Sequence, residues 1–162
     1  MFELHPVQID DEAGVLQFEL ENRTYFAESI TDRGDDYFEK FAERHRELLA
    51  EQEAGRCAYY LLVSDHETVV GRFNLYELSQ GTANVGYRVG RQFSGAGVAT
   101  SGLVELCHIA RTEHALRTLS ATTSNENIAS QKVLVKAGFV AIEAAVVAGR
   151  QGVRYQLSLE SH

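Results

Sequence analysis

The chain has 162 residues, 44% of them hydrophobic, and its formal net charge at pH 7 is −8. This length and apolar content suit one domain over residues 1–162 with a proper core, and a second domain is not expected. The acidic balance argues against a nucleic-acid partner, because Lys and Arg are what hold phosphate backbones, and it favours a cationic partner such as an amine.

Cysteine usage and hydropathy point away from the disulfide-rich and membrane classes. Cys57 and Cys107 are the only cysteines, and each is expected to be a small buried apolar residue. The chain start has no basic segment followed by an apolar run, and no apolar stretch is long enough to cross a bilayer. The six histidines show no ligand spacing. We therefore expect a soluble, cytoplasmic protein without a metal site or a membrane partner.

Hydrophobic periodicity predicts the elements of the first half of the chain. They are, in order, a strand at 2–7, a helix from Asp10 or Asp11 to Glu21, a loop at 22–36, a helix from Tyr37 that Gly55 closes, and strands at 57–63, 69–76 and 83–89. Three strands in succession indicate an antiparallel meander.

The second half is expected to begin with an amphipathic helix that runs to Thr112. The elements after it are a strand at 119–123, a helix that ends at Ala137 before Gly138, and a closing hairpin of strands 139–147 and 153–159. The residues expected on the buried side of the first helix are Leu103, Val104, Cys107 and Ala110. This order of elements is α+β or mixed α/β.

A glycine-rich turn separates the strand at 83–89 from the amphipathic helix. Gly95 and Gly97 permit a sharp turn where that helix begins, and a helix start carries free N–H groups and partial positive charge. The turn is therefore a natural seat for an anion such as a phosphate. The simpler interpretation is a tight strand-to-helix turn without a ligand.

Two familiar phosphate-binding motifs do not fit this turn. A P-loop needs Lys and Ser/Thr after its last glycine, whereas Val98 and Ala99 follow Gly97. A dinucleotide fingerprint needs a third glycine where Thr100 stands and an acidic residue about twenty positions further on, and neither is present.

Two sequence motifs lie in register with each other. The turn reads Gln92-x-x-Gly95-x-Gly97-x-Ala99, and a later segment reads Asn127-x-x-Ser130-x-x-Val133-Leu134-x-Lys136-x-Gly138-Phe139. They resemble motif A and motif B of the GNAT N-acetyltransferase superfamily. The run 84–87, Asn-Val-Gly-Tyr, and the Asn-x-x-Ser form of motif B are most similar to the RimJ/RimL branch, which includes acetyltransferases of protein N-terminal amines.

The resemblance implies a GNAT-like fold and an acetyl-CoA cosubstrate. The fold would be α/β (α+β mixed), with a central, mostly antiparallel twisted sheet of about six to seven strands, about four helices, and splayed strands at the cofactor site. The residues implied in cofactor binding are Tyr87, Val89, Gln92, Gly95, Ala96, Gly97, Val98, Ala99, Thr100 and Asn127. Backbone N–H groups of the turn would hold the pyrophosphate, and Asn127 would hold the pantetheine arm.

The catalytic assignments also follow from the resemblance. The N–H of Val89 would face the thioester carbonyl as an oxyanion donor. Many members of the superfamily have a tyrosine as proton donor where this chain has Leu134, so Ser130, one turn earlier, is the expected donor or water anchor. Candidates for a general base are defined by region only, and they are Glu28, Asn84 and Glu143.

The acceptor side is expected to involve Tyr25, Phe26 and Glu28 of the first loop, Asn84, and the hairpin around 149–152. The expected activity is direct attack of a primary amine on the thioester, with a peptide N-terminal amine as one acceptor and small amines or antibiotics as others. Structural interpretations stay open beside this one: Asn127 as a helix N-cap, Ser130 as a helix residue, and the first loop as packing. The functional alternative is a catalytically silent acyl-CoA-binding or interaction module, and a third possibility is a GNAT-like fold without a cofactor. Pairing into a homodimer is common in the superfamily.

Overall fold

The computed structural model describes residues 2–95 and 97–159. The elements in chain order are β1 (Phe2–Pro6), a 3-10 turn (Ile9–Asp11), α1 (Glu12–Glu21), α2 (Arg23–Ala27), α3 (Asp35–Glu39), α4 (Phe41–Glu53), β2 (Ala58–Ser64), β3 (Val69–Ser79), β4 (Thr82–Val89), a second 3-10 turn (Arg91–Phe93), α5 (Val98–Glu113), β5 (Thr118–Ser124), α6 (Ile128–Lys136), β6 (Val140–Val147) and β7 (Arg150–Ser158). Ala96, which the motif places in the glycine turn, lies outside the described residues.

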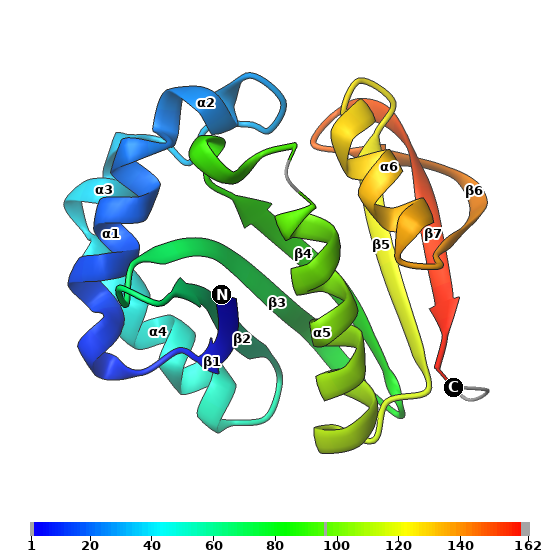
Figure 1. Ribbon diagram of the computed structural model, residues 1–162, viewed down its shortest axis with the longest axis horizontal. Coiled ribbons are helices and arrows are strands. Elements are labelled where there is room, and N and C mark those ends of the chain that lie inside the picture. Colours follow the sequence, from blue (N-terminus) through cyan, green and yellow to red (C-terminus); the bar gives the residue numbers. More distant parts are fainter. Residues whose placement is uncertain (1, 96, 160–162) are drawn as a thin grey trace.

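One mixed sheet forms the centre of the molecule (Figure 1). Its seven described strands run in the order β1-β2-β3-β4-β5-β7-β6. Strands β2, β3 and β4 form the predicted antiparallel meander, and β4 and β5 are the parallel pair. The mostly antiparallel sheet predicted from the resemblance is therefore confirmed.

The parallel pair β4–β5 is joined at one end only. The two strands pair from Thr82 opposite Thr118 to Asn84 opposite Ser120, and they diverge beyond that point (Figure 1). Strand β5 continues to Ser124 paired with β7 on its other side. The expected splay is thus present, and it leaves the edge of β4 that faces β5 unpaired from Val85 to Val89.

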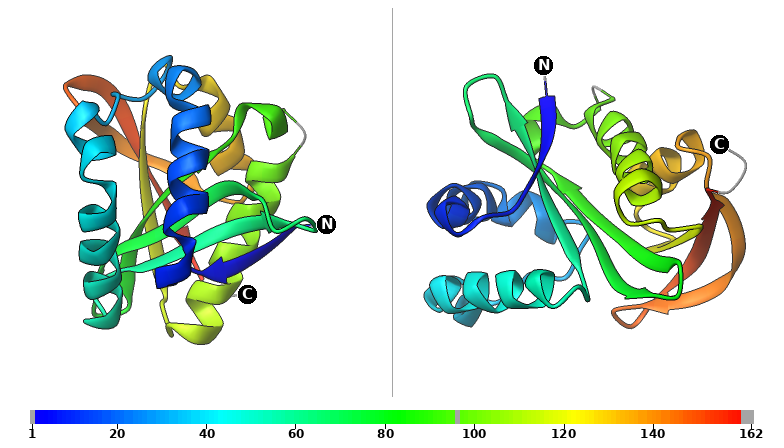
Figure 2. Two further views of the ribbon diagram at one scale, coloured as in Figure 1. Left: turned by 90° about the vertical axis from the view of Figure 1, so that its left-hand side faces the viewer. Right: turned by 90° about the horizontal axis from the view of Figure 1, so that it is seen from below.

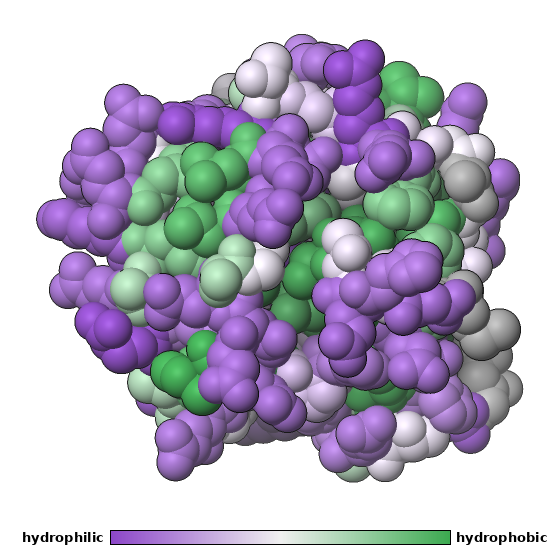
Figure 3. Space-filling model, turned by 60° about the vertical axis from the view of Figure 1, so that its left-hand side comes forward, coloured by the Kyte–Doolittle hydropathy of each residue, from purple (hydrophilic) through white to green (hydrophobic). Residues whose placement is uncertain are grey.

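Helices cover both faces of the sheet. Figure 2 shows α1 and α4 on one face of β1–β4 and α5 on the other. The side chains that are almost completely inaccessible include Phe73, Leu75, Leu103, Leu106 and Leu119. Burial of each such side chain stabilises the fold by about 1.5–3 kcal/mol. The surface turned to the viewer in Figure 3 is mainly hydrophilic, with hydrophobic residues in separate patches, so the core holds most of the large apolar side chains.

Helix α5 approaches β3 closely because Gly102 has no side chain. A Cβ at Gly102 would collide with the aromatic ring of Phe73. On the same helix, the prediction for Val104 is wrong, since this side chain is 50% exposed and Leu106 is buried instead. The buried stripe passes through Leu103, Leu106, Cys107 and Ala110, so the predictions for Leu103, Cys107 and Ala110 are confirmed.

The predicted loop at 22–36 is wrong in part, because it contains α2 and the start of α3. With these two short helices, the described residues form six α-helices rather than about four. The buried ring of Phe26 packs against Phe18, with ring centroids 5.6 Å apart, and this tertiary contact holds a helix too short to show a period. The predicted helix from Tyr37 is also divided, because Lys40 leaves helical geometry between α3 and α4.

The closing hairpin has a shorter turn than the sequence indicated. Only Ala148 and Gly149 connect β6 to β7, and both have positive φ, 49° and 79°. Such two-residue turns match the twist of paired strands, so β7 begins at Arg150 rather than at Val153. Gly138, with φ of 100°, ends α6 as predicted.

The prediction for the two cysteines is confirmed, since Cys57 and Cys107 are both buried and free. None of the helices in the described ranges is long and apolar enough to pass through a membrane. Residues 2–95 and 97–159 also contain no group of three or more His, Cys, Asp or Glu side chains placed to hold a metal ion.

Candidate functional site

A cavity of about 180 Å³ lies where β4 and β5 diverge. Its walls come from the α2–α3 connection, β3, β4, β5, α6 and the β6–β7 turn. The lining residues are Ser29, Ile30, Thr31, Tyr76, Val85, Gly86, Tyr87, Ala121, Thr122, Thr123, Ser124, Asn127, Ser130, Leu134, Val147, Ala148 and Arg150. The sequence-predicted residue Tyr87 of β4 is therefore brought together here with Asn127 and Ser130 at the start of α6.

The backbone of β4 presents polar groups to this gap. The N–H of Gly90 donates to the carbonyl oxygen of Val70 on β3 at 2.9 Å. Successive residues of an antiparallel strand direct their N–H and C=O groups to opposite sides, so those of Val89 and Tyr87 point away from β3. Because β5 has left β4 at Asn84, no strand pairs with these groups. The edge offers donors and acceptors to an extended ligand.

A hydroxyl pair bridges β4 and α6 across the cavity. The Tyr87 hydroxyl lies 3.0 Å from the Ser130 hydroxyl, and it also donates to the Ser130 carbonyl oxygen at 3.3 Å. The Tyr87 ring stacks on Phe73, with centroids 5.7 Å apart and an interplanar angle of 14°. The stacking contact with Phe73 therefore holds the Tyr87 ring in place, and the Tyr87 hydroxyl lies in the wall of the cavity.

Burial raises the pKa of Tyr87 above its ordinary value, and the hydrogen bond with Ser130 only partly offsets this effect. The phenol consequently keeps its proton at neutral pH and acts as a donor. The Tyr87 hydroxyl is a candidate functional group that sequence reasoning missed, because the prediction used only the backbone of this residue. The alternation of β4 was the available signal, since it sets Tyr87 on the same face as buried Val85.

Asn127 caps α6, as one of the open interpretations proposed. Its Oδ1 accepts the N–H of Ser130 at 3.2 Å. Its Nδ2 donates to no other described residue, and the side chain lines the cavity. The side-chain amide of Asn127 can therefore cap α6 through Oδ1 and donate a hydrogen bond to a ligand through Nδ2. Leu134 also lines the cavity and is 1% exposed, so its position contributes apolar surface and no proton donor.

The two glycines of the turn are exposed to solvent. Gly95 and Gly97 both have φ of 76°, and a Cβ built on either would meet no atom within 4 Å. The N–H of Ser101 donates to the carbonyl oxygen of Gly97 at 3.0 Å. The N–H groups of Val98, Ala99 and Thr100 lie in the first turn of α5, where a helix leaves its N–H groups without intrahelical partners. The turn can therefore accept an anion without displacing a described side chain.

Gln92 lies in the 3-10 turn before the glycines and lines a different cavity. Its neighbours there include Phe18, Asn22 and Gly90, on the α1 side of the turn. The N–H of Arg91 donates to Oδ1 of Asn22 at 2.9 Å, which ties the turn to α1. Gln92 is exposed on the α1 side of the turn, while Val98, Ala99 and Thr100 form the helix start itself.

The acceptor-side residues expected from the sequence are dispersed. Phe26 is buried beneath the guanidinium of Arg88, 4.6 Å from its ring centroid, and Tyr25 packs on Phe26. Glu28 is exposed just after α2. The lining is provided instead by the following residues, Ser29, Ile30 and Thr31.

The three general-base candidates do not line the cavity in the described structure. Asn84 donates to Glu77 at 3.0 Å, and Glu143 binds Arg154 at 3.0 Å. Among the described lining residues, Arg150 is the charged one and carboxylates are absent. An acceptor amine would therefore meet hydroxyls, amides and one cation there.

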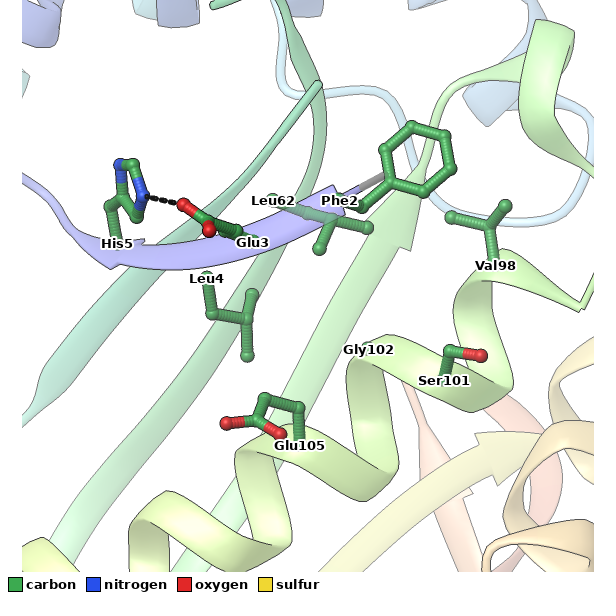
Figure 4. Close-up of a pocket in the computed structure, with 9 residues that line it drawn as sticks. All are labelled: Phe2, Glu3, Leu4, His5, Leu62, Val98, Ser101, Gly102 and Glu105. Atoms are coloured by element: carbon green, nitrogen blue, oxygen red, sulfur yellow. Dashed lines mark hydrogen bonds and ion pairs between the residues drawn. The ribbon is translucent and has the colours of Figure 1, made fainter. Parts of the chain in front are cut away.

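A larger cavity, of about 520 Å³, lies between β1 and α5 (Figure 4). Its lining includes Glu3 and Glu105, which are unsuited to a polyphosphate. Strand β1 is the edge of the sheet, three strands from β4, so this cavity is separate from the splay. We assign it no part in the chemistry.

Sequence comparison finds one family and one curated relative that resemble this chain. Residues 2–140 match the acetyltransferase (GNAT) domain family. The probable N-acetyltransferase YjcK of Bacillus subtilis (strain 168) is 25% identical over 142 residues, which cover 84% of this chain and 78% of that protein.

Solved structures share the fold over nearly the whole chain. The ribosomal-protein-S5-alanine acetyltransferase of Vibrio fischeri superposes with a TM-score of 0.90 at 17% identity, covering 98% of this chain and 93% of that one. RimJ of Mycobacterium smegmatis, in complex with CoA-disulfide, superposes with a TM-score of 0.87 at 24% identity, covering 99% and 83%. These identities show a common fold.

Proposed function

This chain belongs to the GNAT acetyltransferase family, and on that premise we propose that it transfers the acetyl group of acetyl-CoA to a primary amine. The N-terminal amine of a protein or peptide is the favoured acceptor, because the motifs at 84–87 and 127–130 are most similar to the RimJ/RimL branch. The observation that carries the proposal is the cavity at the divergence of β4 and β5, with the Tyr87–Ser130 hydroxyl pair in its wall. We propose further that residues 1–162 act as one acetyltransferase domain.

The chain's own groups fit acetyl-CoA. The open turn at Gly95 and Gly97 and the free N–H groups at the start of α5 suit the pyrophosphate, which is the chemistry that helix N-termini favour. The unpaired edge of β4 suits the amide groups of the pantetheine arm, and Nδ2 of Asn127 adds a donor. Acetyl-CoA supplies an acetyl group activated as a thioester.

Two features of the site would promote acyl transfer. The N–H of Val89 faces the gap and would donate to the carbonyl oxygen as negative charge develops there. The hydroxyls of Ser130 and Tyr87 would donate a proton or a hydrogen bond to the departing sulfur. A free thiol has a pKa of about 8.5, so this leaving group needs only modest assistance.

The acceptor amine must arrive without its proton, because an ammonium has no lone pair. The described cavity lining contains no carboxylate to remove that proton. We therefore propose that water takes it at the cavity mouth, with the apolar side chains of Val85 and Leu134 favouring the neutral amine inside.

The second candidate function is a catalytically silent acyl-CoA-binding module. Leu134, which replaces the tyrosine of many relatives, is the observation in its favour. The experiment that separates the two is release of CoA from acetyl-CoA by the purified protein with a panel of peptides, amino acids and polyamines, and mass spectrometry of the products. Acetyl-CoA binding by isothermal titration without transfer to any acceptor would support the silent module. Absence of binding would overturn both.

A further inference from the structure

A buried carboxylate on α1 is shared by three guanidinium groups. Glu19 is 1% exposed, and it accepts hydrogen bonds from Arg72 at 2.7 Å, from Arg33 at 3.0 Å and from Arg88 at 3.1 Å. Three cations face one anion, so this cluster carries excess positive charge.

The pKa shifts of Glu19 and Arg88 agree with this excess. Burial alone would raise the pKa of Glu19, but the charges of Arg33, Arg72 and Arg88 outweigh it and lower that pKa. Burial, together with the like charges of Arg33 and Arg72, lowers the pKa of Arg88 to about 10 despite the attraction of Glu19. The guanidinium stays protonated at neutral pH, and its surroundings favour additional negative charge.

A pocket of about 210 Å³ opens beside the cluster, between α3, α4 and the sheet. Its lining residues are Arg33, Tyr37, Phe41, Arg44, His45, Leu48, Tyr59, Arg72 and Asn74. This described lining carries three guanidiniums and no carboxylate. Arg44 on α4 has no acidic partner within residues 2–95 and 97–159.

The acidic residues Asp32, Asp35 and Asp36, which flank Arg33 in the sequence, form salt bridges with cations outside the pocket. Asp32 and Asp35 both bind Arg23, at 2.9 and 2.8 Å. Asp36 lies 3.7 Å from Lys40. These carboxylates therefore do not compensate the charge of Arg33 and Arg44.

The pocket also contains an oxygen that lacks a donor. Oδ1 of Asn74 is buried and has no hydrogen-bond partner in the described structure. Buried carbonyl oxygens are nearly always paired, so this one favours a ligand that brings an N–H or O–H group. Guanidiniums and an acceptor oxygen together suit a carboxylate whose neighbouring backbone carries an N–H.

The pocket adjoins the proposed acetyl-transfer cavity. Asn74 on β3 is the register partner of Gly86 on β4, and Gly86 lines that cavity. Tyr76, two residues beyond Asn74 and on the same face of the strand, lines it as well. The connection after α2 forms a wall of both, with Thr31 in the cavity and Arg33 in the pocket. One extended acceptor can therefore reach from one to the other.

We propose that this pocket, lined by Arg33, Arg44 and Arg72, binds a carboxylate of the acceptor, so that the preferred acceptors are amines that also carry a carboxylate. The inference rests on the proposed N-acetyltransferase function and names its substrate class. Two sources supply this chemistry: an Asp or Glu side chain near the N-terminus of a peptide, and the carboxylates of a free amino acid. Charge-assisted hydrogen bonds from guanidinium groups give such recognition its strength.

The test compares acceptors that differ only in charge. Acetyl transfer is measured with peptides that carry Glu or Gln at their second and third positions, and with free glutamate beside its diamide. We expect kcat/KM to be about tenfold or more higher for the Glu peptide, as one good charged interaction provides. Arg44→Gln should remove most of that preference, and Arg44→Lys should retain part of it. Arg46→Gln, which removes the same charge from the exposed side of α4, should preserve it.

Equal kcat/KM for Glu and Gln peptides in the wild type would overturn the carboxylate site while N-acetyl transfer stands. A preference seen with free glutamate alone would assign the carboxylate to an amino acid rather than to a peptide side chain. If no acceptor is acetylated, the proposed function fails. Isothermal titration of the same peptides into the protein with CoA then tests whether the pocket binds a carboxylate. Tighter binding of the Glu peptide that Arg44→Gln abolishes supports the site, and equal binding overturns it.

Discussion

The hydroxyl of Tyr87 on β4 lies 3.0 Å from the hydroxyl of Ser130 on α6, at the point where the strands diverge. Motif B of many relatives carries a tyrosine where this chain has Leu134, and that helix position offers no hydroxyl here. Strand β4 places the phenol of Tyr87 in the same cavity, on the wall that faces α6. We therefore propose Tyr87 together with Ser130 as the counterpart of the proton donor that the motif lacks.

The first prediction concerns this hydroxyl pair. Tyr87→Phe keeps the ring that stacks on Phe73, and Ser130→Ala keeps the helix, so each removes one O–H group. We expect each variant to lower kcat by about tenfold to hundredfold, at or below the lower end of the range of general acid catalysis, with little change in acetyl-CoA binding. The double variant should be little slower than either single one, because the two groups act together.

A matched control is Tyr60→Phe. The Tyr60 hydroxyl bonds to His114 at 2.8 Å on the far side of the core, so kcat should not change. Steady-state kinetics and isothermal titration measure the two effects separately. Equal loss of acetyl-CoA binding in Tyr87→Phe and Ser130→Ala would contradict the donor role.

The sequence was informative where the function depends on local geometry. Local spacing predicts the turn at Gly95 and Gly97 and the cap at Asn127, because each involves only residues a few positions apart in the sequence. The Tyr87–Ser130 pair joins residues 43 positions apart, and no local pattern specifies it. Glu19 meets Arg88 across 69 positions, and α2 is held by the burial of Phe26 rather than by its period.

The second prediction concerns the pH dependence of transfer. Burial raises the pKa of Tyr87, so this phenol does not ionise below its ordinary value of about 10. With no carboxylate in the described lining, the rate should rise with pH as the acceptor amine loses its proton, near 7.7–8.0 for an α-amine, and then level. A decline in kcat between pH 8 and 10 that Tyr87→Phe abolishes would show that Tyr87 ionises, against this expectation.

The third prediction concerns the buried carboxylate of Glu19. Its pKa is lowered by the three arginines, so its charge stabilises the fold fully above its unfolded value of 4.5, and this contribution is lost as the pH falls through the lowered folded value. Glu19→Gln leaves the guanidiniums uncompensated at neutral pH. We expect the free energy of unfolding in urea to decrease by about 3–5 kcal/mol.

The control for that variant is Glu21→Gln, which removes an exposed carboxylate from the same helix. It should change the free energy of unfolding by less than about 0.5 kcal/mol. Below pH 4.5 the free energy of unfolding should fall less steeply with decreasing pH in Glu19→Gln than in the wild type, and Glu21→Gln should not show this change. Equal stability of the two variants at pH 7 would show that the cluster does not depend on Glu19.

The fourth prediction separates binding from backbone strain at the glycine turn. Gly97→Val puts a β-branched residue at a φ of 76° and a side chain into the open space of the turn. Gly55→Val imposes a similar strain, at a φ of 79°, after α4 and away from the cavity. Both should lose stability to a similar extent, by about 1–2 kcal/mol, but only Gly97→Val should weaken acetyl-CoA binding, on the order of tenfold or more. Unchanged binding by folded Gly97→Val in isothermal titration would remove the turn from the cofactor site.

The last prediction links the packing of α5 to the hydroxyl pair. A methyl group at Gly102 would collide with the ring of Phe73, and that ring supports Tyr87 by stacking. Gly102→Ala should therefore destabilise the protein by about 1–3 kcal/mol, as overpacking of a core does, and should also lower kcat because the Tyr87 hydroxyl is displaced. Gly14→Ala is the matched control, since its methyl group meets Val69 at an ordinary 3.5 Å. It should be neutral or should stabilise α1 by about 0.5–1 kcal/mol. Adding Phe73→Leu to Gly102→Ala should relieve the collision and restore part of the stability in urea unfolding. It removes the stacked ring, however, so kcat should stay low. Recovery of kcat together with stability would show that Tyr87 holds its position without Phe73.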